Sequence, residues 1–346
     1  MSALAGEIAA RRVPLDAAAL LEAQAAADAG VTHSPLGSTP WLYLSLDAAA
    51  SIHAQHRRQL HSWLRSRACP VIGAGEPAGN PFASACDVVV ADDAEAQALI
   101  DNIERTPLAA MTLVQVLRAT ELLPIAQALL VESIGYATLQ AGPEFRSWLA
   151  DHRERARSLA ARTPAAGPPL RLERTGTRLS ITLARPERRN ALSVEMRDAL
   201  VEALELVARD PSIETAVIGG DGPDFCAGGD LAEFGTAPDP ATAHAVRSAW
   251  LPAQALVACL DRVEFRLHGA CVGAGAELAA FGRRVVAAPD TWFRLPELGF
   301  GLIPGAGGCV SLVRRIGRQR AAWLAISGRR IDAGTALGWG LLDSIG

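Results

Sequence analysis

Short apolar segments alternate with polar ones in the first part of the chain, and their lengths are typical of an α/β arrangement. A buried strand is predicted at Trp41–Leu46, followed by a helix from Asp47 to about Arg67. Two further short strands are predicted at Pro70–Gly73 and Asp87–Ala91. From Ala94 to about Arg157 the apolar spacing becomes helical, so a helical region follows these strands.

Prolines predict where this helical region breaks and where it ends. Proline lacks the amide donor that a helix interior needs, so helices end or begin beside it. The breaks are predicted at Pro107, Pro124 and Gly142-Pro143. A run of proline, glycine and small residues at 162–169 then predicts a linker. It separates an N-terminal α/β and helical region, 1–161, from a second domain, 170–346.

After the linker, strands and helices alternate. Leu170–Arg174 and Arg178–Leu183 flank Thr175-Gly176, which predicts a β-hairpin. Ser193 is placed to cap a helix with an apolar face formed by Met196, Leu200, Leu204 and Val207. Further strands are predicted at Thr215–Ile218, Val263–Leu267 and Arg284–Ala287. This alternation predicts βαβ units and a mostly parallel sheet.

Composition and charge exclude several classes of function. Half of the residues are apolar and a fifth are charged, which is typical of a soluble globular protein. The formal net charge of -4 gives no basic face for nucleic acid. The chain has no lysine, so any phosphate on a ligand must be bound by arginine or by backbone N–H groups. No apolar run reaches membrane-spanning length without charge or proline, and the N-terminus lacks the apolar core of a secretion signal.

The cysteines point to a reducing compartment. Six are scattered along the chain, at Cys69, Cys86, Cys226, Cys259, Cys271 and Cys309. None forms a CxxC pair or a set with histidines at metal-ligand spacing, so neither a disulfide framework nor a metal site is expected. The simplest interpretation is a cytoplasmic protein.

Two glycine-rich turns follow predicted strands. The first is Asp224–Leu231, with the sequence DFCAGGDL, and the second is His268–Leu278, HGACVGAGAEL. Neither matches a dinucleotide fingerprint or a phosphate loop with its lysine. Glycine lets a ligand approach the main chain closely, and two such turns can aim two free amides at one carbonyl oxygen, as in an oxyanion hole. Either turn alone is also consistent with a tight turn that binds nothing.

Five segments together resemble the enoyl-CoA hydratase/isomerase (crotonase) superfamily in their order and spacing. They are Arg185–Ser193, Asp224–Leu231, His268–Leu278, Phe293–Leu298 and Gly301–Gly308. The resemblance covers about half of the chain. It implies an α/β fold with the ββα superhelix of the ClpP/crotonase type, preceded by a smaller α/β and helical region. It also implies an acyl-CoA substrate, with coenzyme A as part of that substrate and no other cofactor.

The resemblance also implies site residues. The oxyanion amides would be those of Gly229 and Ala274, and the two catalytic carboxylates those of Glu277 and Glu297. The adenosine and pantetheine of coenzyme A would be lined by Arg189, Ala191, Ala227, Gly228, Asp230 and Leu231. Many members of the superfamily have glycine at the position of Ala274, but the donor is a backbone N–H, which alanine retains.

Two carboxylates favour hydration of a 2-enoyl-CoA thioester. One must accept a proton from water while the other delivers one to C2, and two amides stabilise the negative charge on the thioester oxygen. Members that only shift a double bond need a single carboxylate at the position of Glu297. Isomerisation, thioester hydrolysis, cofactor-free oxygenation and a catalytically silent assembly subunit stay open as alternatives. As purely structural groups, Glu277 would be a charge favoured by a helix N-terminus and Glu297 a residue of an apolar run.

Other chemistry-bearing residues fit structural roles better. His53, His56 and His61 lie on one predicted helix without acidic or thiol partners, which indicates a solvated face rather than a metal site. Cys226, beside the first turn, is explained as a small buried apolar residue. His268 is expected to pack. Gly305–Gly308 could bind phosphate, but the resemblance implies that it shapes the acyl pocket.

The N-terminal region departs from the superfamily pattern. About 160 residues precede the resemblance, and the usual C-terminal helices are not recognised after it. We therefore expect the segment from about Thr106 to Arg157 to dock on the second domain, in the same subunit or a neighbour. The residues expected to be buried are Leu129, Leu130, Ile134, Leu139, Phe145 and Trp148. The resemblance further implies a homo-oligomer, a trimer or a dimer of trimers, in fatty acid metabolism.

Overall fold

The computed structural model describes residues 12–26, 28–157 and 167–346. The chain forms two compact units, 1–115 and 116–346. The predicted linker at 162–169 lies largely outside the described residues. The units therefore divide before the predicted boundary, and the helices of 116–157 belong to the same unit as the C-terminal half. The predicted division at 161–170 stays a prediction about which parts fold alone.

The first unit contains a parallel three-stranded sheet in the order β1-β2-β3. Its strands are β1 (Leu42–Ser45), β2 (Val71–Ala74) and β3 (Val88–Val90), so all three predicted strands are confirmed. Its helices are α2 (Ala17–Ala25), α3 (Ala29–Thr32), α4 (Leu46–Ala50), α5 (Ala54–Arg65), η1 (Ala83–Ala85) and α6 (Asp93–Arg105), and α7 (Pro107–Thr120) crosses into the second unit.

One helix expected in this unit is divided in two. The pattern from Asp47 to Arg67 predicted a single helix, but α4 ends at Ala50 and α5 begins at Ala54. His53 takes an extended conformation between them, and its ring nitrogen accepts a hydrogen bond from the Gln55 amide at 3.4 Å. The ring is thus an N-cap, which agrees with a structural role for this histidine.

A six-stranded sheet forms the centre of the second unit, in the order β12-β9-β7-β6-β5-β4. Its strands are parallel except for β4, which pairs antiparallel with β5. Their bounds are β4 (Leu170–Thr175), β5 (Arg178–Leu183), β6 (Thr215–Gly220), β7 (Val263–Leu267), β9 (Arg284–Ala287) and β12 (Ser344–Ile345). The predicted hairpin and the mostly parallel sheet are therefore confirmed.

A second sheet of three short strands lies in the same unit, in the order β11-β10-β8. Its strands are β8 (Ala270–Val272), β10 (Trp292–Arg294) and β11 (Ile331–Asp332). β8 and β10 are parallel, and β10 and β11 are antiparallel. Each is too short for a clear period-two pattern, so the sequence did not predict them. β8 and β10 directly follow β7 and β9 in strand order, and β8 lies within the second glycine-rich turn.

Helices cover these sheets. They are α8 (Ile125–Gln140), α9 (Pro143–Arg157), η2 (Pro186–Arg188), α10 (Val194–Arg209), η3 (Leu231–Glu233), α11 (Pro240–Trp250), α12 (Pro252–Val257), η4 (Leu260–Arg262), α13 (Ala274–Ala279), η5 (Glu297–Phe300), α14 (Gly308–Ile316), α15 (Arg318–Ser327) and α16 (Ala333–Trp339). Ser193 caps α10 as predicted, with its hydroxyl accepting from the Met196 amide at 3.2 Å. The predicted breaks at Pro107, Pro124 and Pro143 are also confirmed.

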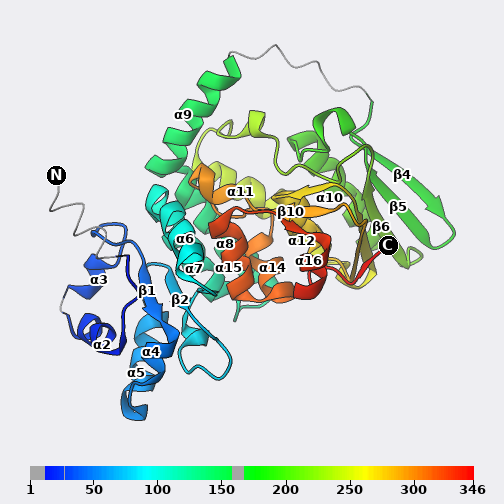
Figure 1. Cartoon of the computed structure of the whole chain (residues 1–346). Coiled ribbons are helices and arrows are strands. Elements are labelled where there is room, and N and C mark those ends of the chain that lie inside the picture. The colour runs from blue at the N-terminus through cyan, green and yellow to red at the C-terminus, as the bar shows by residue number, and fades with distance from the viewer. Residues whose placement is uncertain (1–11, 27, 158–166) are drawn as a thin grey trace. The chain divides into compact units, whose positions relative to one another are not determined.

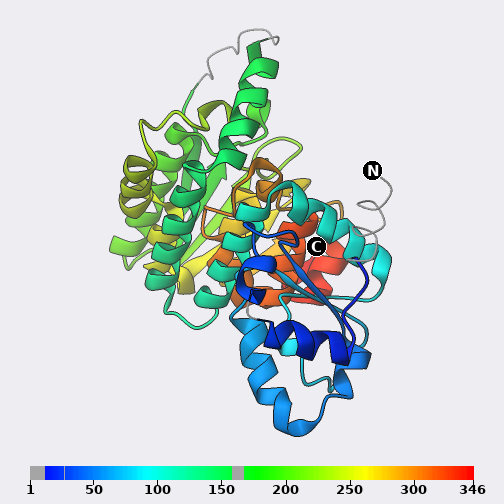
Figure 2. The same ribbon diagram turned by 90° about the vertical axis from the view of Figure 1, so that its left-hand side faces the viewer.

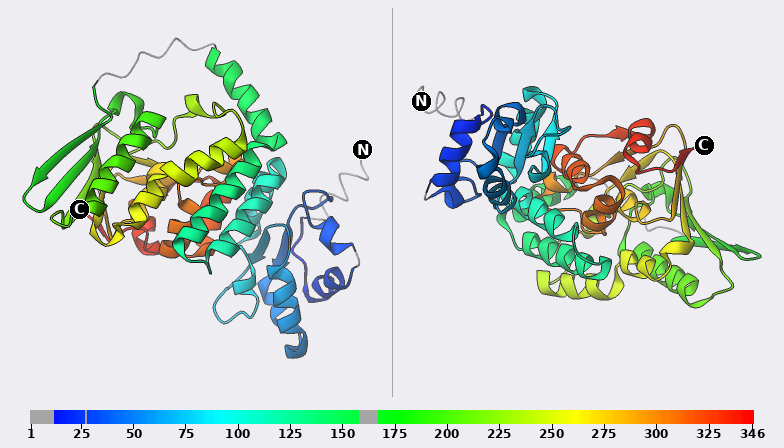
Figure 3. Two further views of the ribbon diagram at one scale, coloured as in Figure 1. Left: turned by 180° about the vertical axis from the view of Figure 1, so that it is seen from behind. Right: turned by 90° about the horizontal axis from the view of Figure 1, so that it is seen from below.

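Helices α8 and α9 pack on the rest of the second unit, which confirms docking within one chain. Figures 1 and 3 show α8 beside α11, and α9 extends beyond the other helices at its C-terminal end (Figure 2). Leu129, Leu139 and Phe145 are buried as predicted. The prediction was wrong for Leu130 and Ile134, which are 47% and 49% exposed because they lie on the outer face of α8. Trp148 is half-buried.

Candidate functional site

Backbone hydrogen bonds join the first glycine-rich turn to the segment that precedes α10. The Ala227 amide donates to the Arg189 carbonyl at 2.9 Å, and the Leu192 amide donates to the Gly228 carbonyl at 2.8 Å. The Asp230 amide returns to the Leu192 carbonyl at 3.1 Å. Arg189 itself has a φ of 53°, so this segment bends sharply before it meets the turn. The two segments therefore form one rigid surface.

The two glycine-rich turns lie side by side, as their sequence positions predicted. The Cys226 amide donates to Ala270 and the Val272 amide donates to Cys226, both at 3.0 Å. Farther along, a methyl group added to Gly228 would lie 3.1 Å from the Val272 carbonyl oxygen, and one added to Gly273 would lie 3.7 Å from the Cα of Gly228. Both glycines have positive φ, so the close approach requires glycine at each.

Two backbone amides stay unused at this junction. Leu192 and Gly229 form a parallel bridge whose hydrogen bonds use the amides of Leu192 and Asp230, not that of Gly229. Ala274 is the first residue of α13, where helical amides have no partner within the helix. In the part of the chain that the structure describes, neither the Gly229 nor the Ala274 N–H donates a hydrogen bond. They are the two amides that the resemblance assigned to an oxyanion hole.

Glu277 lies in the first turn of α13 and is 2% exposed. One carboxylate oxygen, Oε2, accepts from two backbone amides, Ala306 at 2.7 Å and Gly308 at 2.9 Å. Burial raises the pKa of Glu277 to about 7, and the two amides oppose that rise because they stabilise the charged form. Glu277 is therefore held by Oε2 while Oε1 keeps its acceptor capacity.

A third buried glutamate, which the sequence did not reveal, reaches the same turn from α8. Glu132 is 1% exposed; its Oε1 accepts from the Gly307 amide and its Oε2 from the Cys309 amide, both at 2.7 Å. The four successive amides from Ala306 to Cys309 thus alternate between Glu277 and Glu132. Burial first, and then the charge of Glu277, raise the pKa of Glu132 well above its ordinary value.

Glu297 approaches the second glycine-rich turn from η5. A methyl group added to Gly273 would lie 2.5 Å from Glu297 Oε1, so glycine is required there for the carboxyl group to reach this position. Its other oxygen, Oε2, is buried and has no hydrogen-bond partner within the described residues. Burial, followed by the charge of Glu277, raises the pKa of Glu297 well above its ordinary value. The structure thus brings Glu277 and Glu297 into electrostatic contact.

The residues predicted to contact coenzyme A lie along the joined segments. The side chain of Arg189 is exposed and donates to Asp224 at 2.6 Å. Asp230 is buried, accepts from the Ala232 amide at 3.0 Å, and pairs with Arg188 at 3.7 Å. Ala191, Ala227 and Leu231 are partly exposed, and Gly228 is buried. Their role toward coenzyme A stays a prediction.

Aromatic side chains close the site on the side of the helices. The ring of Phe234 would lie 2.9 Å from a methyl group on Gly229, so it covers the first turn. Trp148 of α9 packs against both Phe234 and Phe300, with ring centroids 6.0 Å and 4.7 Å away. Tyr136 of α8 packs against Gly305, where a methyl group would come within 2.3 Å of the ring. The helices α8 and α9 therefore supply part of the site.

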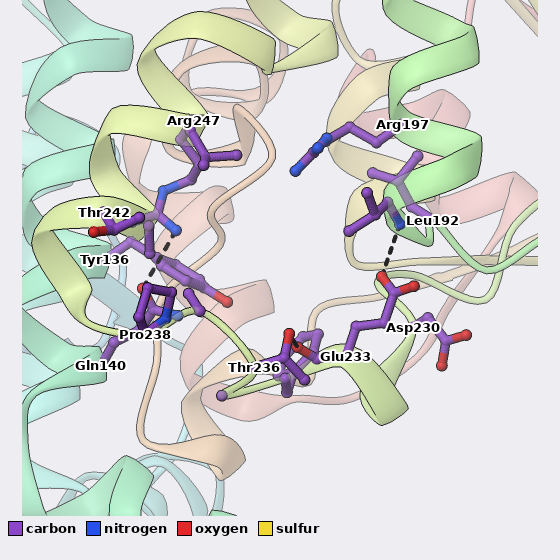
Figure 4. A pocket seen from close by; sticks show the side chains of 16 residues that line it. Tyr136, Gln140, Leu192, Arg197, Asp230, Glu233, Thr236, Pro238, Thr242 and Arg247 are labelled. Carbon is purple, nitrogen blue, oxygen red and sulfur yellow. Dashed lines mark hydrogen bonds between the residues drawn. The ribbon is translucent and has the colours of Figure 1, made fainter.

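A pocket of about 440 Å³ opens beside these residues (Figure 4). It begins at Leu192, Asp230 and Phe234, which flank Gly229, and extends between α8 and α11. The side chains labelled in Figure 4 include Tyr136, Gln140, Arg197, Glu233 and Arg247. Within the described residues, no helix could span a membrane, and no group of three or more His, Cys, Asp or Glu residues could hold a metal ion. All six cysteines are buried and free.

The sequence did not predict three residues of the site, because they belong to no glycine-rich turn: Glu132, Tyr136 and Arg247. The signal that could have revealed Glu132 is its setting. It follows Leu129-Leu130-Val131 and precedes Ile134 in a helical pattern, and a charge in such a run is often buried and paired. Arg247 has no comparable signal, since its helix is amphipathic and arginine is common on exposed faces.

Comparison with known proteins agrees with the motifs. A family profile described as Enoyl-CoA hydratase/isomerase matches residues 173–346. The chain is 38% identical over 168 residues to 2,3-dehydroadipyl-CoA hydratase of Escherichia coli K12, covering 48% of this chain and 65% of that protein. It is also 38% identical to 1,2-epoxyphenylacetyl-CoA isomerase of the same organism, covering 47% and 64%. The chain thus spans slightly less than two thirds of these relatives.

Other matches extend slightly farther. Enoyl-CoA hydratase EchA19 of Mycobacterium tuberculosis is 31% identical, with 53% of this chain and 70% of that protein covered. Among solved structures, an enoyl-CoA hydratase of Mycobacterium smegmatis has a TM-score of 0.48 at 32% identity and covers 52% of this chain and 70% of that one. The family match over residues 173–346, together with this relative from Mycobacterium tuberculosis, confirms the predicted crotonase-type fold of the C-terminal half. The chain belongs to the enoyl-CoA hydratase/isomerase family.

Proposed function

We propose that the protein hydrates a 2-enoyl-CoA thioester. The observation that carries the proposal is a pair of carboxyl groups in electrostatic contact beside two unused backbone amides: Glu277, which is buried, and Glu297, whose Oε2 is buried. Supporting it, relatives of similar identity are named as hydratases. Coenzyme A belongs to the substrate in this reaction, and the reaction requires no other cofactor.

The amides of Gly229 and Ala274 would bind the thioester oxygen. Attack of water at C3 places negative charge on that oxygen, and preorganised N–H donors stabilise it without reorganisation. Loss of one such donor typically costs about 3 kcal/mol of transition-state stabilisation. The donors belong to segments that are fixed by backbone hydrogen bonds, so their direction does not depend on a flexible side chain.

The two glutamates divide the proton transfers according to their surroundings. Glu277, with a pKa near 7 and two amides on one oxygen, is ionised in a substantial fraction of molecules at neutral pH and accepts a proton from water. Glu297, whose pKa is raised well above its ordinary value by burial and by the charge of Glu277, would be the group that donates a proton to C2. The hydroxyl oxygen of water forms the new bond to C3, so atoms and charge balance.

Isomerisation is the second candidate, because one observation favours it. Glu277 already spends Oε2 on two amides, whereas Glu297 has a buried oxygen without a partner in the described residues. A single carboxyl group that removes a proton at one carbon and returns it at another would suffice to shift a double bond. A relative of equal identity is named as an isomerase.

One experiment separates the two reactions. The purified protein is incubated with trans-2-butenoyl-CoA or a trans-3-enoyl-CoA in water enriched in oxygen-18, and products are analysed by mass spectrometry. Hydration yields a 3-hydroxyacyl-CoA that carries the heavy oxygen, and isomerisation yields a shifted enoyl-CoA without it. Full-length protein that turns over neither substrate would contradict both candidates.

A further inference from the structure

Arg247 is a charged side chain on the wall of the pocket, and the proposed reaction does not use it. It lies on α11, and its guanidinium stacks on Tyr136 with 4.4 Å between the guanidinium carbon and the ring centroid. Nε donates to the Ser133 hydroxyl at 3.1 Å, Nη1 to Gln140 at 3.3 Å, and Nη2 to the Ser133 carbonyl at 3.3 Å. Figure 4 shows this arrangement on the wall opposite Arg197 and Leu192.

After these hydrogen bonds, Arg247 still has unused N–H donors and a positive charge available for a ligand. A guanidinium has five N–H groups, and three are used here, which leaves one on each Nη. All three acceptors are neutral, and no carboxylate among the described residues lies within ion-pair distance of Arg247. The side chain is only partly exposed, and Glu132, which interacts with it electrostatically, forms no ion pair with it and accepts from two backbone amides instead. Such a group favours an anionic ligand more strongly than an exposed arginine does.

The pocket extends from Arg247 to the residues that flank the first glycine-rich turn. At one end Leu192, Asp230 and Phe234 flank Gly229, whose amide is a proposed donor to the thioester oxygen. On the other side Tyr136 contacts both Arg247 and Gly305, in the turn that binds Glu277. The volume of about 440 Å³ corresponds to roughly fifteen times the share of one water molecule in the liquid, about 30 Å³, so an acyl chain of several carbons fits.

The remaining charged groups on the wall already have partners. Arg197 pairs with Asp198 at 2.6 Å. Glu233 accepts from the Val194 amide at 2.7 Å, and Asp230 pairs with Arg188. In Figure 4 the two acidic residues lie at the lower right and Arg247 at the upper left. An anion that enters at Gly229 and extends toward α11 would therefore meet Arg247.

We infer that Arg247 recognises a carboxylate at the far end of the acyl group, so that the preferred substrates are 2-enoyl-CoA thioesters with a terminal carboxylate. The inference rests on the proposed hydration and names its substrate class. The same guanidinium could instead bind a phosphate of coenzyme A, since both are anions. The pocket begins beside Gly229, and Tyr136 on its wall contacts Gly305, next to the amides that bind Glu277, so its location favours the acyl group.

The test compares two trans-2-enoyl-CoA thioesters of equal chain length, one ending in a methyl group and one in a carboxylate. For the wild type we expect a kcat/KM at least tenfold higher for the carboxylate substrate. Arg247→Gln should lower the ratio of the two kcat/KM values by about 10- to 100-fold, the range typical of a hydrogen bond to a charged group. Arg247→Lys should retain part of the preference because it keeps the charge.

Arg314→Gln is the matched control. Arg314 donates to the Leu123 carbonyl at 2.6 Å and does not line the pocket, so its loss should leave the ratio unchanged. A wild type without preference, or a ratio that Arg247→Gln does not change, would overturn the inference. Equal weakening of both substrates and of free coenzyme A would instead assign Arg247 to a phosphate, and the inference would be wrong.

Failure of the proposed hydration gives a different result. If neither enoyl thioester is hydrated, the affinities of the saturated pair, one acyl-CoA with a terminal methyl and one with a terminal carboxylate, are measured by calorimetry. Tighter binding of the carboxylate compound that is lost in Arg247→Gln would support the inference even then. Equal affinities would overturn it.

Discussion

The two walls of the candidate site differ in what fixes their geometry. The turn wall, formed by residues 226–231 and 270–277, directs backbone amides that are held by backbone hydrogen bonds. The helix wall, formed by Glu132, Tyr136 and Arg247 on α8 and α11, presents side chains. The backbone of the turn wall depends on a few glycines with positive φ, and many different residues are compatible with its other positions. Side chains, by contrast, carry chemistry that a single substitution removes.

This difference separates two properties of an enzyme. Groups on the turn wall would serve any thioester, since every such substrate has the same carbonyl oxygen. Groups on the helix wall contact what varies between substrates, or hold the turn wall in place. Substitutions in the turn wall should therefore reduce turnover for all substrates, whereas those in the helix wall should change selectivity, pH dependence or stability.

The largest effect is expected at the two proposed acids. Glu297→Gln and Glu277→Gln should each reduce kcat by at least about a hundredfold, the lower end of the range for general acid–base catalysis. Glu277→Gln can retain the native geometry, because a single oxygen accepts from both amides and the other can be replaced by NH₂. Binding of coenzyme A, measured by calorimetry, should stay nearly unchanged. Hydration at the wild-type rate by either variant would remove that residue from the mechanism.

Loss of one proposed oxyanion donor should have a similar effect on turnover. Gly229→Pro removes the N–H, so activity should decrease by roughly two to three orders of magnitude. Gly229→Ala is the matched control, because it keeps the N–H although its methyl group must displace Phe234 from a 2.9 Å contact. Circular dichroism establishes that both variants fold. A folded proline variant with activity equal to that of the alanine variant would place the oxyanion hole elsewhere.

A smaller effect is expected at Glu132, and it should appear in the pH profile. The charge of Glu277 raises the pKa of Glu132, and because the interaction of two coupled carboxyl groups is mutual, we expect the loss of Glu132 to ease the ionisation of Glu277. In wild type the acidic limb of kcat/KM should have an apparent pKa of about 7, as Glu277 must be ionised to accept a proton. In Glu132→Gln this limb should move to lower pH. If Glu132 has a purely structural role, the variant should be less active but the apparent pKa of the acidic limb should be unchanged.

The smallest effect concerns stability against pH. The folded-state pKa of Glu277 is about 7, against an ordinary value of 4.5, so the folded protein keeps a proton that the unfolded chain loses between these values. Its contribution to the free energy of unfolding is therefore full below about pH 4.5 and decreases as the pH rises toward 7. Glutamine does not titrate in this range, so the stability of Glu277→Gln lacks this pH dependence. The Tm of this variant minus that of wild type should increase from pH 5 to pH 8, and a constant difference would contradict the assigned pKa.

The sequence predicted the turn wall because its features are local. The Cys-Ala-Gly-Gly-Asp and Gly-Ala-Gly-Ala-Glu runs each combine a strand end, glycines and an acid within a few residues. The ends of the helices were also predicted from local features, namely Pro107, Pro124 and Pro143. The helix wall was not predicted, because Glu132 and Arg247 become partners of the site only through packing of α8 and α11. The outward positions of Leu130 and Ile134 show the same limit, since a largely apolar helix does not reveal which face it buries.

The hydrogen bonds from the amides of residues 306–309 to Glu277 and Glu132 have a consequence for folding during synthesis. Glu132 and the Gly307 amide are 175 positions apart, so ribosomes release α8 long before the turn that it binds. At about 5–20 residues per second, the interval is roughly 10–35 s. Until then, the buried face of α8 has no docking site and its carboxylate no amide. The nascent chain thus exposes this face of α8 during that interval, and deletion of residues 305–308 would remove the turn on which it docks.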